Sequence, residues 1–474
     1  MIDTRQLRAY GRRPPQPLSL TLDDGRSLQI LQWLRILPGK RLVGQALLDG
    51  EPVLAKLFIA HGAERHWSRE KQGVEALQLK AIPTPGLVAS GQIPGGGHYL
   101  LTRFLSGAQT QQQRWEALSS TEPASAEAQG LVAEVVAMLA RMHAQGLIQS
   151  DLHMGNFLWQ QGQLYVIDGD AVSVQSPSEA LSARDAADNL GAFFAQLPVA
   201  WEEQLELLLV GYLGVNSARA IDPQRVLQAL ERGRQWRLQD YLGKALRDCS
   251  LFSVRRNWWR FLSIKRSESA ELLPVMNEPD SLFDSEPLLK DGGSSTVTRF
   301  TLGERTLVVK RYNIKSLGHW LRRFWRPSRA WHSWLAAHRL QFLDIATPAP
   351  LAMCESRFGP LRRRAWLVTE FCPGQDLLSL FDPTGQELPA PEQRQALLKV
   401  FSELARQRIS HGDCKATNLL WHQGRVWLID LDAMQAHSSE TAWRRAWAED
   451  RARLIRNWPA GSSLALWLDE QLPR

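Results

Sequence analysis

The sequence predicts an α+β protein built from two tandem units, and three observations lead to this prediction. With 474 residues the chain exceeds what one hydrophobic core usually supports. Two stretches, 150–170 and 411–432, share one pattern of polar residues. Each follows an apolar, β-rich region and then an amphipathic helical segment. We therefore expect each unit to have a small antiparallel β-rich N-lobe and a mainly helical C-lobe.

The repeated pattern has the residue types of a phosphoryl-transfer site. Five positions separate an Asp from an Asn, and twelve more lead to a second Asp: Asp151, Asn156 and Asp168 in one stretch, and Asp413, Asn418 and Asp430 in the other. Such a site needs one carboxylate to accept a hydroxyl proton, and an amide and a second carboxylate to hold Mg²⁺ against nucleotide phosphates. One loop of this kind arises easily by chance, but two with identical spacing do not. The spacing predicts two protein-kinase-like domains that use ATP and Mg²⁺.

The composition is that of an ordinary globular protein, with 44% hydrophobic and 22% charged residues. The N-terminus has no apolar signal region and no apolar run reaches bilayer length, so we expect a cytoplasmic protein. Four scattered cysteines without a C-x-x-C pair suggest neither a disulfide framework nor a zinc site. The net charge of +7 favours an anionic partner, and charge alone does not choose between nucleic acid, phosphorylated glycan and acidic lipid.

Arginine and tryptophan occur together in the segments 255–260 (RRNWWR) and 320–326 (WLRRFWR), and the chain has nineteen tryptophans. Amphipathic rings and guanidinium groups suit a membrane headgroup region or a sugar-phosphate ligand. Packing within helices and the core is an equally good interpretation.

The first domain is expected to span residues 1–270. Strands are predicted over 27–37, 42–48 and 52–58, the last carrying Lys56, and a helix over 63–80 carries Glu70. A strand lysine paired with a helix glutamate is the arrangement that holds the lysine toward ATP phosphates. A helix over 126–143 then leads to Asp151. One difference between the repeats is Gln149, which stands where the second has His411, a position that usually braces the loop.

Residues 271–287 mix acidic residues with prolines and show no periodicity, which predicts a linker. The second domain is expected over 288–474. Its turn contains Gly292 and Gly293, whose backbone N–H groups can approach phosphates, and Lys310 closes the following strand. The next helix, near 328–343, contains no glutamate, and Ser333 stands at the position of Glu70. Either the ion pair is missing here or another residue has taken its role.

Little chain follows Asp430, so there is little room for the activation segment and the A-P-E element of a protein kinase. A small-molecule or glycan acceptor therefore fits better than a folded protein.

The second domain resembles the lipopolysaccharide kinase family, which includes heptose and Kdo kinases and InaA-like proteins. The resemblance lies in four segments: 327–331, 347–350, 411–420 and 427–434. It implies phosphorylation of a sugar in the lipopolysaccharide inner core or in a lipid-linked glycan, at the cytoplasmic side of the inner membrane. Heptose is the first candidate for this sugar. Peripheral membrane contact through the Arg/Trp-rich segments is expected, and nucleic acid is not.

The resemblance also implies roles for individual residues. Asp413 would act as the base beside Lys415, Lys310 would contact phosphates, and Asn418 and Asp430 would hold Mg²⁺. The first domain resembles the wider group of kinase-like phosphotransferases through 151–153, Asn156 and Asp168.

Three alternatives remain open at this point. One domain could be a pseudokinase that only binds or scaffolds, since each domain departs from the pattern at one position. The chain could be a protein kinase-like enzyme with another acceptor. A non-enzymatic nucleic-acid binder is suggested by charge alone.

Overall fold

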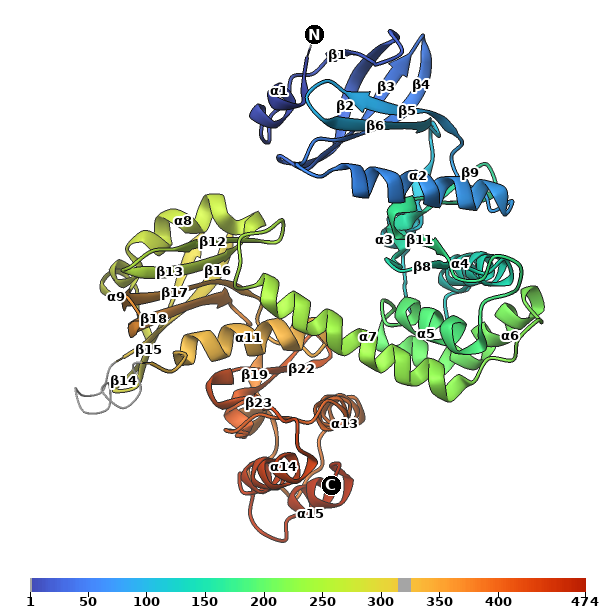
Figure 1. Ribbon diagram of the computed structural model, residues 1–474. Helices are drawn as coiled ribbons and strands as arrows, with labels where there is room; N and C mark the ends of the chain where they lie inside the picture. The colour runs from blue at the N-terminus through green and yellow to red at the C-terminus, as the bar shows by residue number, and fades with distance from the viewer. Residues whose placement is uncertain (1, 314–324) are drawn as a thin grey trace. The chain divides into compact units, whose positions relative to one another are not determined.

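The computed structural model describes residues 2–313 and 325–474 of the chain (Figure 1). The chain divides into two compact units, Met1–Trp236 and Arg237–Arg474. Helix α7 (Pro223–Lys244) contains the point of division.

The N-lobe of the first unit is a six-stranded antiparallel sheet with the order β1-β2-β3-β4-β6-β5. Its strands are β1 (Leu18–Thr21), β2 (Ser27–Leu37), β3 (Arg41–Leu48), β4 (Glu51–Phe58), β5 (Leu87–Ile93) and β6 (Gly97–Arg103). Helix α1 (Thr4–Ala9) precedes the sheet, and α2 (Glu64–Leu79) connects β4 to β5. Every second residue of β3 is buried, as expected for a strand with one face on a core.

The C-lobe of the first unit is mainly helical, with α3 (Gln111–Glu116), α4 (Ala126–Ala144), α5 (Ala183–Phe194), η3 (Val199–Gln204), α6 (Leu205–Val215) and the start of α7. Short strands and turns between α4 and α5 carry the repeated motif: β8 (Leu147–Gln149), η1 (Met154–Asn156), β9 (Phe157–Gln160), β10 (Gln163–Val166), η2 (Gly169–Ala171) and β11 (Val172–Val174). The two-residue strand β7 (Gln109–Thr110) pairs with β9. Ser125 caps α4, whose apolar face is buried.

The N-lobe of the second unit is a seven-stranded antiparallel sheet with the order β12-β13-β17-β18-β16-β15-β14. Its strands are β12 (Phe252–Arg256), β13 (Arg260–Lys265), β14 (Leu288–Gly292), β15 (Ser295–Leu302), β16 (Arg305–Tyr312), β17 (Pro350–Phe358) and β18 (Leu361–Glu370). Helix α11 (Arg329–Phe342) precedes β17.

The boundary between the units lies earlier in the chain than the sequence suggests. Strand β13 pairs with β17, with Leu262 opposite Cys354, so the Trp-rich segment before residue 270 belongs to the second sheet. The expected linker, 271–287, lies within a folded segment that begins with η4 (Arg266–Glu268) and continues with α8 (Ser269–Asn277), η5 (Pro279–Ser281) and α9 (Leu282–Ser285). Leu272 and Met276 are buried in the core of that sheet, which explains why the segment is ordered despite its prolines and acidic residues.

The C-lobe of the second unit repeats the plan of the first. It contains α12 (Leu377–Leu380), α13 (Pro391–Arg406), α14 (Glu440–Ile455) and α15 (Ser463–Gln471). Between α13 and α14 lie β20 (Ile409–Ser410), η6 (Ala416–Asn418), β21 (Leu419–His422), β22 (Arg425–Leu428), η7 (Leu431–Ala433) and β23 (Gln435–Ala436). Strand β19 (Gln375–Asp376) pairs with β21. Within the described residues, no helix is both long and apolar enough to cross a bilayer.

The two sheets share one topology. The order β2-β3-β4-β6-β5 in the first unit corresponds to β14-β15-β16-β18-β17 in the second, with a helix after the third strand of each set. This is the N-lobe arrangement of a protein-kinase-like fold, and a mainly helical C-lobe follows each sheet. The prediction of an α+β chain with two such units is confirmed. The hairpin β12–β13 is an addition at the outer edge of the second sheet.

Candidate active site

Two hydrogen bonds within the motif hold the motif loop of the second unit. The Asn418 side-chain amide donates to the Asp413 carbonyl oxygen at 2.9 Å, and the Ile429 N–H donates to the Asn418 carbonyl at 3.0 Å. These bonds link Asn418 to Asp413 on one side and to Ile429, the residue before Asp430, on the other. The first unit has the same two bonds, from Asn156 to Asp151 at 2.8 Å and from Ile167 to Asn156 at 3.0 Å.

The second Asp of each motif has a left-handed backbone. Asp430 has φ 57° and ψ 56°, and Asp168 has φ 67° and ψ 68°. Such a conformation is uncommon for a residue other than glycine and is often found at functional sites. Its occurrence at the same position of both repeats shows that the two loops have the same local geometry.

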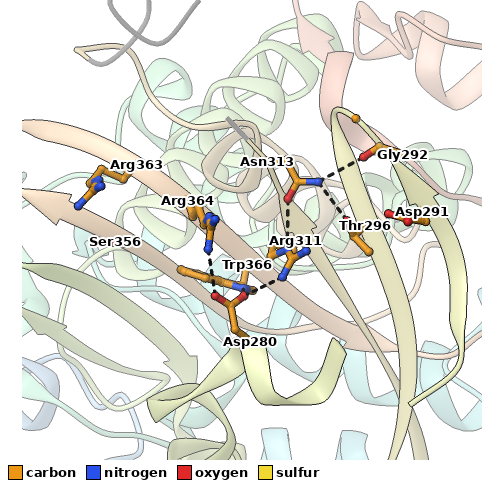
Figure 2. Close-up of a pocket in the computed structure, with 11 residues that line it drawn as sticks. Asp280, Asp291, Gly292, Thr296, Arg311, Asn313, Ser356, Arg363, Arg364 and Trp366 are labelled. Atoms are coloured by element: carbon orange, nitrogen blue, oxygen red, sulfur yellow. Dashed lines mark hydrogen bonds and ion pairs between the residues drawn. The ribbon is translucent and has the colours of Figure 1, made fainter. Parts of the chain in front are cut away.

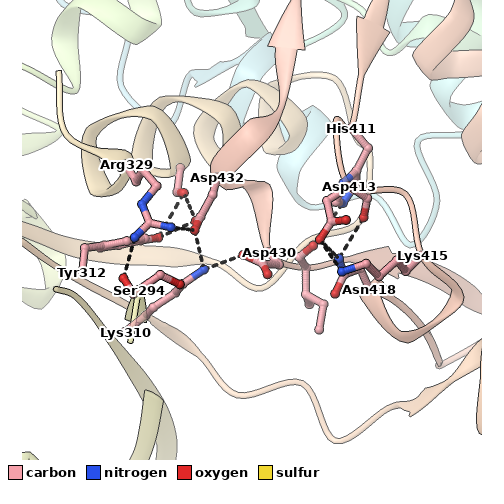
Figure 3. Close-up of polar contacts among 12 residues, drawn as sticks. Ser294, Lys310, Tyr312, Arg329, His411, Asp413, Lys415, Asn418, Asp430 and Asp432 are labelled. Atoms are coloured by element: carbon pink, nitrogen blue, oxygen red, sulfur yellow. Dashed lines mark hydrogen bonds and ion pairs between the residues drawn. The ribbon is translucent and has the colours of Figure 1, made fainter. Parts of the chain in front are cut away.

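In the second unit, Lys310 reaches this loop from β16 (Figure 3). Its ammonium donates to Asp430 at 2.5 Å and to Asp432 at 2.9 Å. Burial favours the neutral form of Asp430, but the charge and the hydrogen bond of Lys310, together with the charge of Lys290, hold the pKa of that carboxyl below its ordinary value.

Asp432 occupies the role that the missing helix glutamate was expected to fill. Besides Lys310, it accepts hydrogen bonds from the Tyr312 hydroxyl at 2.7 Å and the Ser333 hydroxyl at 2.8 Å. Arg329 lies 3.8 Å from the same carboxylate. Ser333 therefore ties α11 to the lysine indirectly, through an aspartate that comes from the loop.

Asp413 lies between two cations. Arg453 of α14 donates to one carboxylate oxygen at 2.5 Å, and Lys415 donates to the other at 2.9 Å. Burial acts to raise the pKa of Asp413, but these two partners outweigh it and hold the pKa below its ordinary value. Asp450 of α14 braces the loop from behind by accepting the Gly412 N–H at 2.9 Å. The aspartate is therefore ionised and oriented.

A cavity of about 350 Å³ opens beside these residues. Its lining contains the Lys310, Asn418, Asp430 and Asp432 side chains together with Lys290. Apolar side chains from both lobes complete the walls: Val297, Val308, Leu367, Leu420 and Ile429. The connection after β18, residues 370–372, borders the same cavity.

The opposite face of the same sheet carries a different cavity, of about 810 Å³ (Figure 2). Successive strand residues point to opposite faces, so Arg311 lines this cavity while Lys310 lines the other. Gly292 and Gly293 also line this second cavity, so the turn expected to cover phosphates is not brought to the first. Asp280 pairs with Arg311 at 3.2 Å and accepts from the Trp366 indole at 2.9 Å. Much of the positive charge here is thus already compensated.

The first unit contains the expected lysine–glutamate pair. Lys56 donates to Glu70, which is 1% exposed, and lies 3.7 Å from Asp168. Glu70 also accepts the Gly169 N–H at 3.1 Å, so the helix, the strand and the motif loop meet at one carboxylate. Burial favours protonated Asp168, but the charges of Lys56 and then Arg41 outweigh it and lower the pKa of that carboxyl.

In the first unit, Gln149 makes the same hydrogen bond to a backbone carbonyl that His411 makes in the second. The His411 ring nitrogen Nε2 lies 3.1 Å from the Ile429 carbonyl, and the Gln149 amide donates to the Ile167 carbonyl at 3.0 Å. The departure from the pattern at this position therefore leaves the loop braced.

The proton-acceptor position of the first unit is more open. The Asp151 side chain is 67% exposed, compared with 26% for Asp413, and its partner is His153 at 3.9 Å. Within the described residues, Asp151 has no arginine that corresponds to Arg453.

Sequence reasoning did not single out Asp432, Arg453, Asp450, Tyr312 or Lys290. A signal was present for Asp432, because both repeats end in Ile-Asp-x-Asp. The others come from elements whose approach to the loop depends on the tertiary fold.

The oxygen donors of the second unit fit a Mg²⁺ ion shared with a nucleotide. Across residues 2–313 and 325–474, no group of three or more His, Cys, Asp or Glu side chains is placed to hold a metal ion alone. Mg²⁺ is usually held by one or two carboxylates together with substrate phosphates and water. The Asn418 amide nitrogen donates to Asp413, which leaves its amide oxygen for a cation, and Asn418 and Asp430 line the same cavity.

The fold and the site place the chain in the class of protein-kinase-like proteins. The model of the lipopolysaccharide kinase (Kdo/WaaP) family matches residues 59–190 and 282–460, which together make up more than half of the chain. The chain belongs to this kinase family, and membership implies the use of ATP.

Similar solved structures include "WaaP in complex with acyl carrier protein", with 18% identity and a TM-score of 0.32, over 44% of this chain and 86% of that one. Vaccinia related kinase 3 is similar at 11% identity and a TM-score of 0.29, over 51% of this chain and 80% of the other. No curated protein sequence matches the chain.

Proposed function

We propose that the chain transfers the terminal phosphoryl group of Mg-ATP to a sugar hydroxyl of the lipopolysaccharide inner core, with heptose as the first candidate, and that transfer occurs in the second unit. Family membership supports a lipopolysaccharide kinase. The observation that carries the assignment to the second unit is the placement of Asp413, which is ionised, oriented by Arg453 and next to Lys415.

The cavity of the second unit suits a nucleotide. Its apolar walls, with Val297 and Val308 from one lobe and Leu420 from the other, can enclose a base. The polar residues at its other side, Lys310 and Asn418, would then face the phosphates. Lys310 contributes a positive charge that is fixed by Asp432 before the nucleotide binds.

The acceptor hydroxyl would lie against Asp413. An ionised carboxylate there can orient the hydroxyl and accept its proton as the oxygen attacks phosphorus. Lys415 would remain beside the oxygens of the transferred group. Mg²⁺, held by Asn418 and Asp430, would neutralise phosphate charge when bound.

The short connection between Asp430 and α14 supports a small acceptor. Only residues 431–439 separate Asp430 from α14. An activation segment that docks a folded protein substrate does not fit into this length.

A nucleotide-binding role without turnover is the second candidate for the first unit. The observation that favours it is the buried Lys56–Glu70 pair next to Asp168, combined with an exposed Asp151. Lys56 would contact the phosphates, whereas Asp151, the candidate proton acceptor, lacks an orienting arginine within the described residues.

The test is phosphoryl transfer from labelled ATP to purified inner-core acceptor by the full chain. Asp413→Ala should reduce transfer by about 10²- to 10⁴-fold, the usual contribution of a positioned base. Asp151→Ala, the matched change in the other motif, should leave most of the transfer intact. Absence of transfer by the wild type to heptose-containing core would refute the acceptor. Equal losses in the two variants would refute the assignment to the second unit.

A further inference from the structure

Two hairpin ends lie side by side at the outer edge of the second sheet. One is the turn 257–259 between β12 and β13, and the other is the turn 358–360 between β17 and β18. The Arg357 N–H donates to the Trp259 carbonyl at 2.7 Å, and the Gly359 N–H donates to the Trp258 carbonyl at 2.8 Å. Their backbones are thus joined up to the tips.

Three large aromatic side chains project from these tips. Trp258 is 59% exposed, Trp259 is 61% exposed and Phe358 is 48% exposed. The rings nevertheless gather, with Phe358 centred 5.2 Å from Trp259 and 6.1 Å from Trp258. A Cβ on Gly359 would come within 2.9 Å of the Trp258 ring, so the glycine lets the indole lie against the turn. The aromatic group is therefore ordered, and much of its surface faces solvent.

The charge around the tips has one sign. Neither 254–264 nor 356–364 contains an Asp or Glu, and the two segments hold seven arginines: Arg255, Arg256, Arg260, Arg357, Arg362, Arg363 and Arg364. Arg357 and Arg362 pair with the buried Glu355. Arg255, Arg256 and Arg363 are exposed and make no ion pair within the part of the chain that the structure describes.

The arginines near the tips also stabilise the base of the hairpins. Arg256 and Arg357 stack on Phe261 at 5.2 and 4.8 Å, and Arg362 stacks on Trp331 at 4.8 Å. These contacts fix the sheet beneath the tips and leave the tip aromatics outward.

We propose that the paired tips 257–259 and 358–360, with Arg255, Arg256 and Arg363, are a docking surface for an anionic lipid bilayer. Tryptophan is favoured at the bilayer interface because its ring is apolar and its N–H is polar. The surrounding arginines match the charge of anionic headgroups. Rings at the ends of turns can enter a headgroup layer without a groove to receive them.

Docking at this edge leaves the cavity accessible. Strand β18 begins at Leu361 beside the tips and ends at Glu370 beside the cavity, and at the usual rise per strand residue these points are about 30 Å apart. The proposal does not depend on which unit transfers phosphate or on the acceptor, since it involves none of the motif residues.

The test is sedimentation of the full chain with vesicles in the absence of nucleotide and acceptor. Vesicles of phosphatidylethanolamine and phosphatidylglycerol are compared with vesicles of phosphatidylcholine alone. The wild type should bind the anionic vesicles, and binding should weaken with salt. Trp258→Ala/Trp259→Ala should reduce binding by about tenfold or more. Trp236→Ala removes a tryptophan that is 70% exposed in the first unit and is the matched control.

The charge contribution is tested separately with Arg255→Gln, Arg256→Gln and Arg363→Gln. Each should lower binding by about fivefold, whereas Arg445→Gln, whose side chain is 86% exposed on α14, should leave it unchanged. Thermal unfolding of every variant verifies that it is folded.

Several results would overturn the proposal: absence of vesicle binding by the wild type, aromatic variants that bind as the wild type does, or equal losses in the Trp236→Ala control. Capture of an acidic protein that is lost with the same variants, without vesicle binding, would assign the surface to a protein partner instead. Phosphoryl transfer to a water-soluble core oligosaccharide is measured in parallel, because its failure bears on the proposed function alone.

Discussion

The Lys310 ammonium donates to Asp432 at 2.9 Å, so the strand lysine of the second unit is anchored by a residue of the motif loop. In the first unit the corresponding lysine is anchored by Glu70 of helix α2. The two units thus anchor the corresponding lysines, Lys310 and Lys56, with carboxylates from different elements.

Asp432→Asn should lower phosphoryl transfer by about 10²-fold, since a misplaced catalytic group commonly has an effect of this size. The neutral amide would keep a similar shape and lose the charge that fixes Lys310. We expect the fall mainly in kcat, with a smaller rise in KM for ATP. Steady-state kinetics at varied ATP provide the measurement.

Two further variants separate positioning from folding. Asp432→Asn/Ser333→Glu places a carboxylate where α2 has Glu70 and should recover part of the lost rate. Asp344→Asn, a change at a side chain that is 85% exposed, should have no effect. An Asp432→Asn enzyme with wild-type kinetics would show that Asp430 alone positions the lysine.

His411→Gln should be tolerated, because Gln149 already makes the equivalent bond in the first unit. We expect a loss of less than about 1 kcal/mol in the free energy of unfolding. His411→Ala leaves the half-buried Ile429 carbonyl without this partner and should cost about 1–3 kcal/mol. Chemical denaturation of both variants gives the comparison, and equal losses would show that volume rather than the hydrogen bond matters here.

Acid should destabilise the first unit through His143. Burial lowers the pKa of His143 to about 4, and the ring is 0% exposed between the Tyr212 hydroxyl at 3.1 Å and the Asn189 amide oxygen at 3.0 Å. In an unfolded chain the pKa of histidine is about 6.5. Between these values the unfolded state binds more protons, so the stability falls as the pH falls through this window, by up to about 3 kcal/mol.

The measurement is the free energy of unfolding at a series of pH values for wild type and His143→Gln. The variant should lose this part of the pH dependence, while the exposed His61→Gln should keep it. Buried His338 is present in all three proteins, so the difference isolates His143. Parallel curves for wild type and His143→Gln would contradict the assignment.

Much of the fold could be predicted because its signals are local. The expected strand over 27–37 coincides with β2, and the helices expected over 63–80 and 126–143 coincide closely with α2 and α4. Alternation and helical periodicity depend only on neighbouring residues. The identical spacing of the two motifs likewise reflects one loop geometry formed twice.

What could not be predicted depends on distant partners. Ser333 and Asp432 are 99 positions apart, so nothing in the helix sequence indicates which carboxylate replaces its glutamate. Burial of the tryptophans also depends on distant partners, because Trp334 of α11 is fully buried whereas Trp258 and Trp259 of the Arg/Trp-rich segment 255–260 are exposed. Trp320, Arg322 and Arg323 of the other such segment, 320–326, lie outside the described residues.

Binding of Mg-ATP should stabilise the second unit, and Asp430→Asn should remove that stabilisation. A ligand that binds only the folded state stabilises it by about 2.7 kcal/mol at a hundred times its Kd. Asp430 contacts Lys310 and, in the proposed function, would also provide an oxygen ligand for Mg²⁺, so loss of its charge should affect both. Asp168→Asn makes the matched change in the first unit, beside Lys56.

Thermal unfolding with and without Mg-ATP distinguishes the units. If the second unit alone binds nucleotide, Asp430→Asn abolishes the shift and Asp168→Asn leaves it unchanged. If both bind, as the Lys56–Glu70 pair supports, each variant loses part of the shift and the double variant loses all of it. A full shift in the double variant would exclude both motif loops as the nucleotide site and with them the proposed phosphotransfer.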